Sequence, residues 1–560
     1  MAYVIGIDTG GTYTDTVLLK TEKRGPEAIV KRAKALTTHD CLEEGIKNSL
    51  KALNLNSSEA DGAERIVLST TLATNAIVER KLCSTGLIIV GDAPRGQLAA
   101  DYTEQVPGKM NIKGRVLVNV SREATLKALE RIAPHVEALA VSGGASVRNP
   151  AQEKQVREII RESSSLPVIC GHEMASSLGY LERTNTAVVN AGLLPIIDRF
   201  MAAVKKSLKA MGIQAPIFVV KGDGSIATEE FIREKPVETA LSGPAASMIG
   251  TISLTGLENI TVSDMGGTTT DIGIVRNRRV ELSEKGADIG GWSLRIKSAR
   301  LRTIGLGGDS AVIKRGENIK IGPERVLPVC RGGEAGLTPT DILHCTGEFT
   351  RWDRELSLDA AGREAAAAGM ETAEYVGLLE EAVAGKIYRE IIEPCSRTGL
   401  PVCAIGAPAE AWYGKVKDKY EFDLKIPRYY EVANAVGAAA AGICQVSEAV
   451  VRKGEEGRGY LVHTEEGRYF FADIKEAVEK GISVSKERAE GLVRKQKLEP
   501  DRIEAEYTEA YMEDGRLRHR KTEWVITEES KEAVYENTED DFDKFVEIRI
   551  KVRAIGKSFV

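Results

Sequence analysis

The sequence lacks the features by which several classes of protein are recognised. Its eight cysteines are dispersed without a CxxC pair, which argues against a disulfide scaffold and against a cysteine-ligated iron–sulfur cluster. Its six histidines form no HxH or HxxxH pair, so no local metal-binding motif is indicated. No stretch of about twenty apolar residues runs uninterrupted, and we therefore predict no membrane-spanning helix.

An excess of basic residues is also missing. The formal net charge is −6, which gives no electrostatic footprint for nucleic acid or for an anionic membrane, and we expect neither as a partner. The N-terminus has no basic region followed by an apolar signal segment and passes directly into a strand pattern. We therefore expect a cytoplasmic location.

What is present is a long chain with ample apolar residues. Its 560 residues are 42% hydrophobic, enough for two or three domains with their own cores. Short apolar strands alternate with helical patterns as far as about residue 446, which predicts an α/β fold. The later part is highly charged and predicts a small α+β appendage. We expect three domains, with the boundaries 1–190, 191–446 and 447–560.

Two helical patterns between these strands are well marked. "NPAQEKQVREIIRES" predicts an amphipathic helix with Asn149 available as its cap. "ERTNTAVVNAGLLPIIDRFMAAVKKSLKAMG" predicts a long helix adjusted at Pro195 and ending at Gly212.

One short pattern occurs twice. "DTGGTYTD" begins at Asp8 and "DMGGTTTD" begins at Asp264, and each lies between two apolar strands. Glycines without a Cβ allow backbone N–H groups to approach phosphate oxygens, and an Asp at the strand end can hold Mg²⁺. One such turn is often only a β-hairpin. Two copies in one chain favour a polyphosphate site, although it is neither a P-loop nor a Rossmann fingerprint.

The paired turns resemble those of the actin, sugar-kinase and heat-shock ATPase superfamily. "AIGAPA" at 404–409 resembles its turn beside adenosine, and "EVANAVGAAAA" at 431–441 its helix returning to the first lobe. The resemblance implies two ribonuclease-H-like lobes that clamp ATP, in an α/β fold with the small α+β appendage at the C-terminus.

The segments between the turns and just after the second one narrow the resemblance. "STTLATNAIVERK", "LERTNTAVVNAGLLP", "LSGPAASMIG", "TIGLGGDS" and "IGPERV" occur in this order, and the chain is similar to the hydantoinase A/5-oxoprolinase family, whose relatives include ATP-dependent acetone and acetophenone carboxylases. The resemblance implies an ATP-dependent amidohydrolase that phosphorylates a cyclic amide or imide carbonyl for hydrolysis. It also implies a nucleotide-binding subunit working with a second subunit of the hydantoinase B type.

Two alternatives stay open at this point. The chain also resembles a carboxylase subunit acting on a ketone, and a regulatory ATPase acting on a partner protein is a different class.

The resemblance also assigns roles to individual residues. Asp8 and Asp264 are expected to hold Mg²⁺. Together with Asp15 and Asp271 they are expected to form the catalytic set. For Asp15 and Asp271 the alternative role is to cap the hairpin by hydrogen bonds to its backbone. The residues expected to bind ATP are Gly10, Gly11, Thr12, Gly266, Gly267, Thr268, Thr269, Gly307, Gly308, Gly406, Ala407 and Asn434.

The substrate side departs from the family. Ser69 stands where family members commonly have a His, and "SGGASVRNP" replaces a second His-containing stretch. The candidates that remain, each with a structural alternative such as a cap, a turn or a buried pair, are Thr70, Thr71, Thr74, Asn75, Glu182, Arg183, Thr184 and Asp309. Lone His172 and His344 favour structural roles. Arg331 beside Cys330 would lower the pKa of an exposed thiol.

Overall fold

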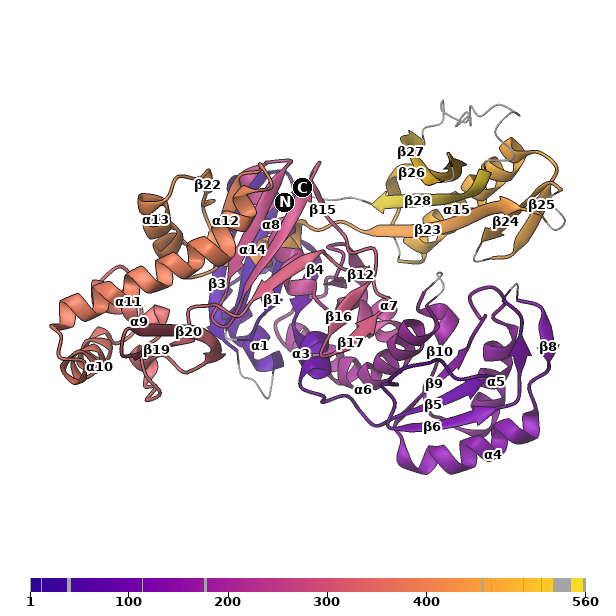
Figure 1. The fold of residues 1–560 in the computed structure, drawn as a ribbon, viewed down its shortest axis with the longest axis horizontal. Coiled ribbons are helices and arrows are strands. Elements are labelled where there is room, and N and C mark those ends of the chain that lie inside the picture. Colours follow the sequence, from indigo (N-terminus) through magenta and orange to yellow (C-terminus); the bar gives the residue numbers. More distant parts are fainter. Residues whose placement is uncertain are drawn as a thin grey trace.

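The computed structural model describes residues 2–11, 13–37, 42–112, 114–175, 179–454, 458–464, 466–496, 498–514, 516–526 and 545–556. Three large sheets and one smaller parallel sheet organise this part of the chain (Figure 1). The mixed α/β architecture predicted from the sequence is confirmed.

The first sheet carries the first Gly-Gly turn. Its strand order is β12-β11-β4-β1-β2-β3, and β1 and β2 form the antiparallel hairpin. The strands are β1 (Tyr3–Thr9), β2 (Tyr13–Lys20), β3 (Ile29–Leu36), β4 (Ala63–Thr70), β11 (Ile217–Val220) and β12 (Ile226–Thr228). Their alternating apolar side chains pack on α1 (Leu42–Leu53), α6 (Tyr180–Ala210) and α7 (Glu229–Glu234).

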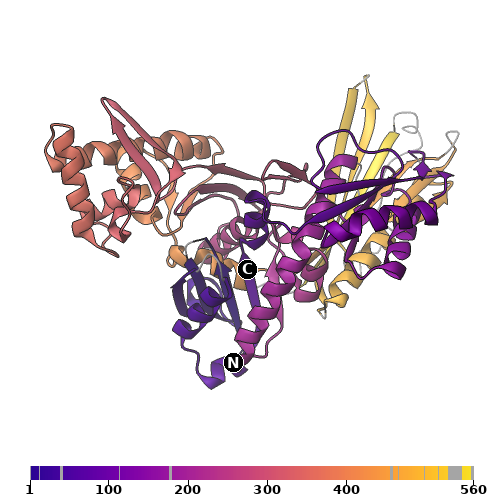
Figure 2. The same cartoon turned by 90° about the horizontal axis from the view of Figure 1, so that it is seen from below.

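The second large sheet carries the second Gly-Gly turn. Its order is β15-β14-β13-β21-β22, with β18 also pairing with β14. The strands are β13 (Ile260–Met265), β14 (Thr270–Arg276), β15 (Arg279–Val280), β18 (Leu301–Ile304), β21 (Val402–Ile405) and β22 (Leu424–Lys425). A helical region packs on it and lies at one end of the molecule in both views (Figures 1 and 2). It contains α9 (Pro339–Thr346), α10 (Arg354–Ala367), α11 (Thr372–Ile387), α13 (Ala409–Lys419) and the hairpin of β19 (Ser310–Arg315) and β20 (Asn318–Arg325).

Two small-residue helices form the core between these sheets. They are α8 (Ser242–Thr255) and α14 (Ala433–Ala440), and their apolar side chains share one cluster with residues of both sheets. A Cβ at Gly250 would lie 1.9 Å from the carbonyl oxygen of Ala433, and one at Gly437 would lie 1.8 Å from that of Ala246. The helix backbones are therefore in direct contact at these two glycines.

The smaller sheet is parallel, with the order β10-β9-β5-β6. Its strands are β5 (Thr85–Val90), β6 (Tyr102–Val106), β9 (Ala138–Gly143) and β10 (Val168–Cys170). Helices α4 (Arg122–Ile132) and α5 (Ala151–Ser163) share a core with it, and the N-terminal part of α6 packs with other residues of its strands. A short hairpin of β7 (Lys109–Met110) and β8 (Val116–Val118) lies beside it.

The C-terminal part is an antiparallel sheet in contact with one long helix. The strand order is β25-β24-β23-β28-β26-β27, and α15 (Ile474–Lys495) packs against it. The strands are β23 (Cys444–Lys453), β24 (Tyr460–Thr464), β25 (Arg468–Phe471), β26 (Pro500–Glu513), β27 (Arg516–Ile526) and β28 (Phe545–Gly556). This sheet and the small parallel sheet lie on the same side of the molecule (Figures 1 and 2).

The expected domain boundary at residue 190 does not follow the sheets. Strands β11 and β12, which the sequence placed in the second domain, extend the first sheet by pairing with β4. The apolar pattern of residues 217–228 indicates a strand but carries no information about which sheet it joins. Between β4 and β11 the chain also builds the small parallel sheet, so the first expected domain contains two sheets.

Helix α6 qualifies as a membrane span by length and apolar composition, although we predicted none from the sequence. Within the structure, 67% of its most apolar window is buried. Its apolar residues pack on the first sheet and on the small parallel sheet, as in the core helix of a folded protein.

We predict that Gly250→Ala lowers the free energy of unfolding by about 1–3 kcal/mol, because the new methyl group forces the two helix backbones apart. Gly377→Ala in α11 is the matched control, since a Cβ there meets nothing within 4 Å, and it should be neutral or slightly stabilising. Urea denaturation of both variants measures the difference. Equal stability of the two variants would contradict the close helix contact.

Candidate functional site

The two Gly-Gly turns have the same local geometry. Asp8 on β1 lies opposite Asp15 on β2, and Asp264 on β13 lies opposite Asp271 on β14. The first glycine of each turn closes the hairpin: Gly10 N–H donates to the Tyr13 carbonyl at 3.0 Å, and Gly266 N–H to the Thr269 carbonyl at 2.9 Å. Each hairpin therefore presents a pair of carboxylates beside its turn.

The four carboxylates belong to one electrostatic group. Burial, together with the charges of Asp15 and Asp264, raises the pKa of Asp8 to about 7. Burial likewise raises the pKa of Asp15 and of Asp264, and that of Asp271 to about 6. Mutual repulsion in a desolvated cleft is costly unless a cation or a proton is taken up.

Helices α8 and α14 hold the two central carboxylates. Ser247 Oγ on α8 donates to Asp264 Oδ2 at 2.5 Å and lies 2.8 Å from Asn434 Oδ1 on α14. Hydrogen bonding by Asn434 lowers the pKa of both Asp8 and Asp264 against the effect of burial. A Cβ at Gly6 would lie 2.1 Å from the Ala435 carbonyl oxygen, so α14 approaches β1 closely enough to reach both hairpins.

The two outer carboxylates have partners of their own. Lys34 on β3 forms an ion pair with Asp15 at 2.7 Å, and Thr303 Oγ1 on β18 donates to Asp271 Oδ1 at 2.6 Å. Neither Asp8 Oδ1 nor Asp15 Oδ1, both buried, has a hydrogen-bond partner among the described residues, but Asp15 Oδ1 has the ion pair with Lys34. Asp8 thus keeps one buried oxygen open to a further ligand.

The loop at 307–309 lies against the second hairpin. Gly308 N–H donates to the Gly266 carbonyl at 3.0 Å, and Asp309 N–H to the Gly267 carbonyl at 2.6 Å. A Cβ at Gly307 would lie 2.5 Å from the Gly267 carbonyl oxygen. The loop is therefore fixed on the turn and adds the buried Asp309 carboxylate, whose pKa is raised by burial.

The turn at Gly406 and Ala407 lies on the other side of the same hairpin. Gly406 has φ +93°, and a Cβ there would lie 2.2 Å from the Met265 carbonyl oxygen and 2.9 Å from Asp264 Oδ1. Only glycine fits this backbone position. The sequence motifs around Asp264, Gly307 and Gly406 therefore meet in space.

Cationic side chains accompany the first hairpin. Lys34 Nζ and the Arg351 guanidinium each lie 4.9 Å from the centroid of the Tyr13 ring. The pKa of Tyr13 is raised by burial and lowered by the charges of Arg351 and Arg331. Residues following the second hairpin in the chain thus face the first hairpin, which gives the cleft positive charge as well as carboxylates.

The "STTLATN" segment supports the first hairpin from β4. Ser69 pairs with Asp8 in register, and hydrogen bonding by its buried hydroxyl lowers the pKa of Asp8 against the effect of burial. Thr71 Oγ1 donates to the Thr9 carbonyl at 3.3 Å. Thr74 Oγ1 accepts from Leu241 N–H at 2.9 Å.

The remaining members of this segment do not line the carboxylate group. Ser242 Oγ donates a hydrogen bond to the Thr70 carbonyl at 2.9 Å. The side chain of Asn75 is exposed.

Several candidates lie away from the paired hairpins. The buried Arg183 donates through Nη2 to the Gly143 carbonyl at 2.5 Å, and Thr184 Oγ1 lies 2.7 Å from Ser142 Oγ, at the end of β9. Glu182 precedes them on α6 and is partly buried. Thr12 falls outside the described residues, whereas Gly11, Thr268 and Thr269 are partly buried in their turns.

The two histidines considered have structural partners, as predicted. His172 Nδ1 lies 2.6 Å from Glu153 Oε2, and the fully buried His344 has Nδ1 2.8 Å from the Thr340 carbonyl. The expectation of a lowered pKa for Cys330 is wrong. Burial and the neighbouring Asp341 raise the pKa of this thiol, so the adjacent Arg331 does not make it reactive.

Sequence reasoning missed Ser247 and Lys34. Ser247 lies inside the quoted motif "LSGPAASMIG", but only the crossing of α8 with α14 shows which carboxylate it reaches. Lys34 is one of several basic residues in β3, and its role follows from its register opposite Asp15.

The chain matches known families over most of its length. Residues 4–164 match the profile described as the hydantoinase/oxoprolinase N-terminal region, and residues 183–446 match that described as hydantoinase/oxoprolinase.

Two relatives are informative. The caprolactamase subunit alpha of Pseudomonas jessenii is 28% identical over 60% of this chain and 53% of its own length. The acetophenone carboxylase gamma subunit of Aromatoleum aromaticum is 28% identical over 69% of this chain and 61% of its own length. The chain thus spans between half and two thirds of the length of these relatives.

Two solved structures share the fold. The crystal structure of ATP-dependent caprolactamase from Pseudomonas jessenii has a TM-score of 0.73 at 22% identity, over 100% of this chain and 88% of that chain. The nucleotide-free structure of acetone carboxylase has a TM-score of 0.72 at 18% identity, over 99% of this chain and 88% of that chain.

We predict that Asp8→Asn stabilises the metal-free protein at neutral pH. Because the pKa of Asp8 is raised to about 7, the folded protein keeps a proton on Asp8 that the unfolded chain releases near pH 4. The free energy of unfolding of the wild type is therefore unaffected by Asp8 at low pH, and it falls as the pH rises from about 4 to about 7. The variant should therefore exceed the wild type by about 2–4 kcal/mol at pH 8, with the difference disappearing near pH 4.

Urea denaturation in the presence of EDTA at both pH values measures this effect. Asp359 is exposed on α10, and Asp359→Asn is the matched control. Its free energy of unfolding should stay within about 0.5 kcal/mol of the wild type at both pH values. A stability gain for Asp8→Asn that does not change with pH would show that its carboxylate is not protonated in the folded state.

Proposed function

Since the chain belongs to the hydantoinase/oxoprolinase family, we propose that it is an ATP-dependent amidohydrolase that activates a cyclic amide or imide carbonyl by phosphorylation. The observation that supports this most strongly is the gathering of both Gly-Gly hairpins, the 307–309 loop and the Gly406 turn around one group of carboxylates. That arrangement suits phosphoryl transfer, in which catalysis is mainly positioning and charge stabilisation.

We propose that the first and second large sheets, which carry the Gly-Gly hairpins, are the ribonuclease-H-like lobes of the actin, sugar-kinase and heat-shock ATPase type. Each sheet carries one hairpin, and α8 and α14 lie between them. Backbone N–H groups of both turns would contact the ATP phosphates, with Thr268 and Thr269 beside them. Gly406 and Ala407 would face the adenosine. Closure of the lobes would exclude bulk water from the reacting groups.

The carboxylates fit Mg²⁺. Asp8 has a buried oxygen without a partner, Asp264 lies within the same electrostatic group, and hard oxygen ligands are the kind that Mg²⁺ prefers. Asp8 and Asp264 would hold the ion, which would neutralise charge on the phosphates. Asp15 and Asp271 are the candidates for orienting water or accepting a proton.

In the proposed reaction the amide oxygen attacks the γ-phosphorus, the bond to the leaving ADP oxygen breaks, the amide nitrogen gives up its proton, and an O-phosphorylated imidate forms. Water then adds to the activated carbon, the ring C–N bond breaks, the ring nitrogen takes the proton of the added hydroxyl, and an acyl phosphate is left. A second water attacks the same carbon, the C–O bond to phosphate breaks, and phosphate leaves with the former amide oxygen while a carboxylic acid remains. Because these relatives are themselves named as subunits, we propose that a second subunit, of the hydantoinase B type, completes the enzyme.

A carboxylase subunit acting on a ketone is the second candidate. It is favoured by the similarity to the acetophenone carboxylase gamma subunit, which covers more of this chain than the caprolactamase subunit does. Family members commonly have a histidine where this chain has Ser69 beside Asp8. Because of this difference, the resemblance to the family does not decide between the two substrates. A cytoplasmic site of action stays a prediction from the sequence.

An ATPase screen separates these candidates. Hydantoins, 5-oxoproline, other lactams and ketones are each added with and without bicarbonate, and release of phosphate is measured. We expect a cyclic amide to stimulate ATP cleavage without bicarbonate. Stimulation by a ketone only together with bicarbonate would replace the amidohydrolase by the carboxylase, and stimulation only by a protein partner would indicate a regulatory ATPase.

We predict that Asp264→Asn reduces Mg·ATP turnover by about a hundredfold or more while the protein stays folded, because one carboxylate at the proposed metal position is lost. Asp359→Asn, exposed on α10, is the charge-matched control and should keep wild-type turnover. Steady-state phosphate release and thermal unfolding measure the two effects. Full turnover by Asp264→Asn would refute the assignment of the nucleotide site.

A further inference from the structure

Two arginines of the helical region that packs on the second sheet direct positive charge to the first hairpin. The Arg351 guanidinium lies 4.9 Å from the centroid of the Tyr13 ring. The charges of Arg351 and Arg331 both lower the pKa of Tyr13 against the effect of burial. Within the described part of the chain, neither guanidinium has an ion pair or a hydrogen bond. Unpaired cations at a cleft favour an anionic ligand.

The acids on which these arginines act already have partners. The charge of Arg351 lowers the pKa of Asp15, which is paired with Lys34 at 2.7 Å. That of Arg331 lowers the pKa of Asp309, which is paired with an arginine of β20 at 3.2 Å. The charge of the two arginines therefore remains available to a further anion.

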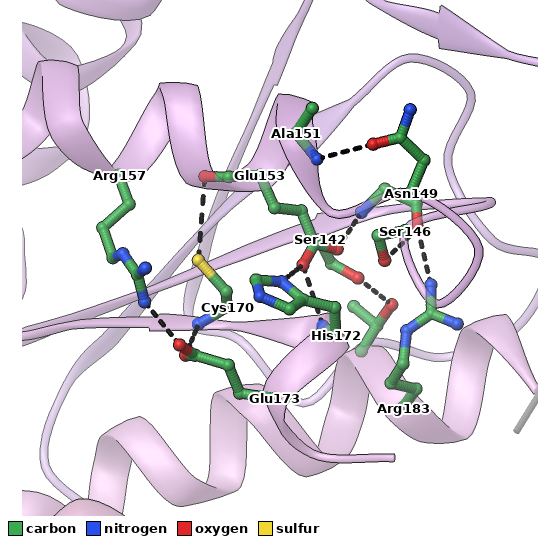
Figure 3. Close-up of polar contacts among 12 residues, drawn as sticks. Ser142, Ser146, Asn149, Ala151, Glu153, Arg157, Cys170, His172, Glu173 and Arg183 are labelled. Carbon is green, nitrogen blue, oxygen red and sulfur yellow. Dashed lines mark hydrogen bonds and ion pairs between the residues drawn. The ribbon is translucent and has the colours of Figure 1, made fainter. Parts of the chain in front are cut away.

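A charged cluster beside the small parallel sheet shows the more common arrangement, in which charges pair within the protein. Glu153 Oε1 accepts from Gly143 N–H at 2.8 Å, and Arg157 Nη1 donates to Glu173 Oε1 at 2.5 Å (Figure 3). Buried charges are usually compensated in this way. The arginines at the first hairpin differ, because among the described residues they contact aromatic rings and pair with no acid.

The Tyr13 ring lies on the face of the first hairpin that carries the carboxylates. Asp8 lies opposite Asp15 in the register of β1 and β2, and Tyr13 is two residues from Asp15 on the same strand. Side chains two residues apart on a strand share a face. Lys34 pairs with Asp15 in register from β3 and has its Nζ 4.9 Å from the Tyr13 ring centroid. Arg351 therefore lies on the side of the hairpin where the carboxylates gather.

Helix α9 is fixed to the second hairpin. Thr340, in its first turn, donates to the Gly308 carbonyl through N–H at 2.9 Å and through Oγ1 at 2.8 Å. Gly308 N–H donates in turn to the Gly266 carbonyl at 3.0 Å. The position of α9 is therefore set by the second Gly-Gly turn.

The segment that carries Arg351 is fixed to the end of α9. The fully buried His344 has Nδ1 2.8 Å from the Thr340 carbonyl, and its Nε2 accepts from Trp352 N–H at 3.2 Å. A ring with Nδ1 as donor and Nε2 as acceptor is neutral. His344 also stacks on the Trp352 ring, with the centroids 5.6 Å apart. The backbone beside Arg351 is therefore held by hydrogen bonds and by packing.

The turn that carries Arg331 is fixed to the same helix. Asp341 accepts from two successive backbone N–H groups of this turn, among them that of Cys330 at 2.8 Å. The guanidinium groups of Arg331 and Arg351 lie 5.4 Å and 5.8 Å from the centroid of the Trp352 ring. One helix thus sets the positions of both arginines relative to the hairpins, which is the preorganisation that charge stabilisation requires.

We propose that Arg351 is a catalytic residue of phosphoryl transfer, with Arg331 adding positive charge beside it. The inference rests on the proposed function and adds a residue to its site. As the amide oxygen bonds to the γ-phosphorus and the bond to the ADP oxygen breaks, the Arg351 guanidinium contacts the γ-phosphoryl oxygens and stabilises their negative charge. It keeps its proton throughout, and it forms and breaks no covalent bond. An arginine in this role is worth about 10³ to 10⁵ in kcat.

The test compares the binding of ADP alone with that of ADP together with aluminium fluoride, which imitates the transferring phosphoryl group. Calorimetry on the full chain in the presence of Mg²⁺ needs no amide substrate. An interaction made only in the transition state strengthens binding of the analogue and not of ADP. We therefore expect Arg351→Gln to weaken binding of ADP with aluminium fluoride by about thirtyfold or more, while the Kd for ADP alone stays within about threefold.

Steady-state phosphate release from Mg·ATP, with the cyclic amide that stimulates it most, gives a second readout. Arg351→Gln should lower kcat by about a hundredfold or more and leave the KM for ATP within about threefold. Arg351→Lys keeps the charge but loses the planar fork, and it should recover about tenfold of the lost kcat. Arg363→Gln, exposed on α10, is the matched control and should behave as the wild type in both measurements. Thermal unfolding monitors the fold of each variant.

Two results would overturn the inference while leaving the proposed function in place. One is Arg351→Gln binding ADP with aluminium fluoride as tightly as the wild type does. The other is an equal loss of affinity for ADP with and without aluminium fluoride, which would show that Arg351 binds the nucleotide without a special role in the transfer.

Failure of the proposed function gives different results. A wild-type protein that binds no ADP would refute the nucleotide site and this inference together. If Arg351→Gln weakens binding as expected but no amide stimulates ATP cleavage by the wild type, only the amidohydrolase is refuted, and Arg351 keeps its role in phosphoryl transfer.

Discussion

The backbone contact between α8 and α14 is the constraint on which the rest of the site depends. Gly250 and Gly437 allow the two helices to touch without intervening side chains. This brings Ser247 and Asn434 next to Asp264 and carries α14 onto β1 at Gly6. Two hairpins about 250 residues apart in the chain thereby share one group of buried and partly buried carboxylates. A bound cation would relieve the cost of gathering them.

The two hairpins were well predicted from the sequence because their turns need residue types that few other structures require. Paired Gly-Gly turns after apolar strands indicated the hairpins, and the structure also brings Gly307 and Gly406 to the second of them. The register that places Asp8 opposite Asp15 and Asp264 opposite Asp271 follows from the turns. The functional roles of these residues stay predictions.

What the sequence could not supply was the pairing of distant elements. The residues of β11 and β12 read as strands, but nothing local shows that they join β4. Lys34 and Ser247 act through partners on other elements. Arg183 was noted only as part of a short motif. Its buried, partly unpartnered guanidinium became visible once the ends of β5 and β9 were placed side by side.

The proposed nucleotide site is built from carboxylates and glycine turns. The central claim, that ATP phosphorylates an amide oxygen, is tested most directly with a carbonyl-¹⁸O lactam that stimulates ATP cleavage. The account predicts that ¹⁸O from the carbonyl appears in the inorganic phosphate released. Label that stays entirely in the organic product would contradict it.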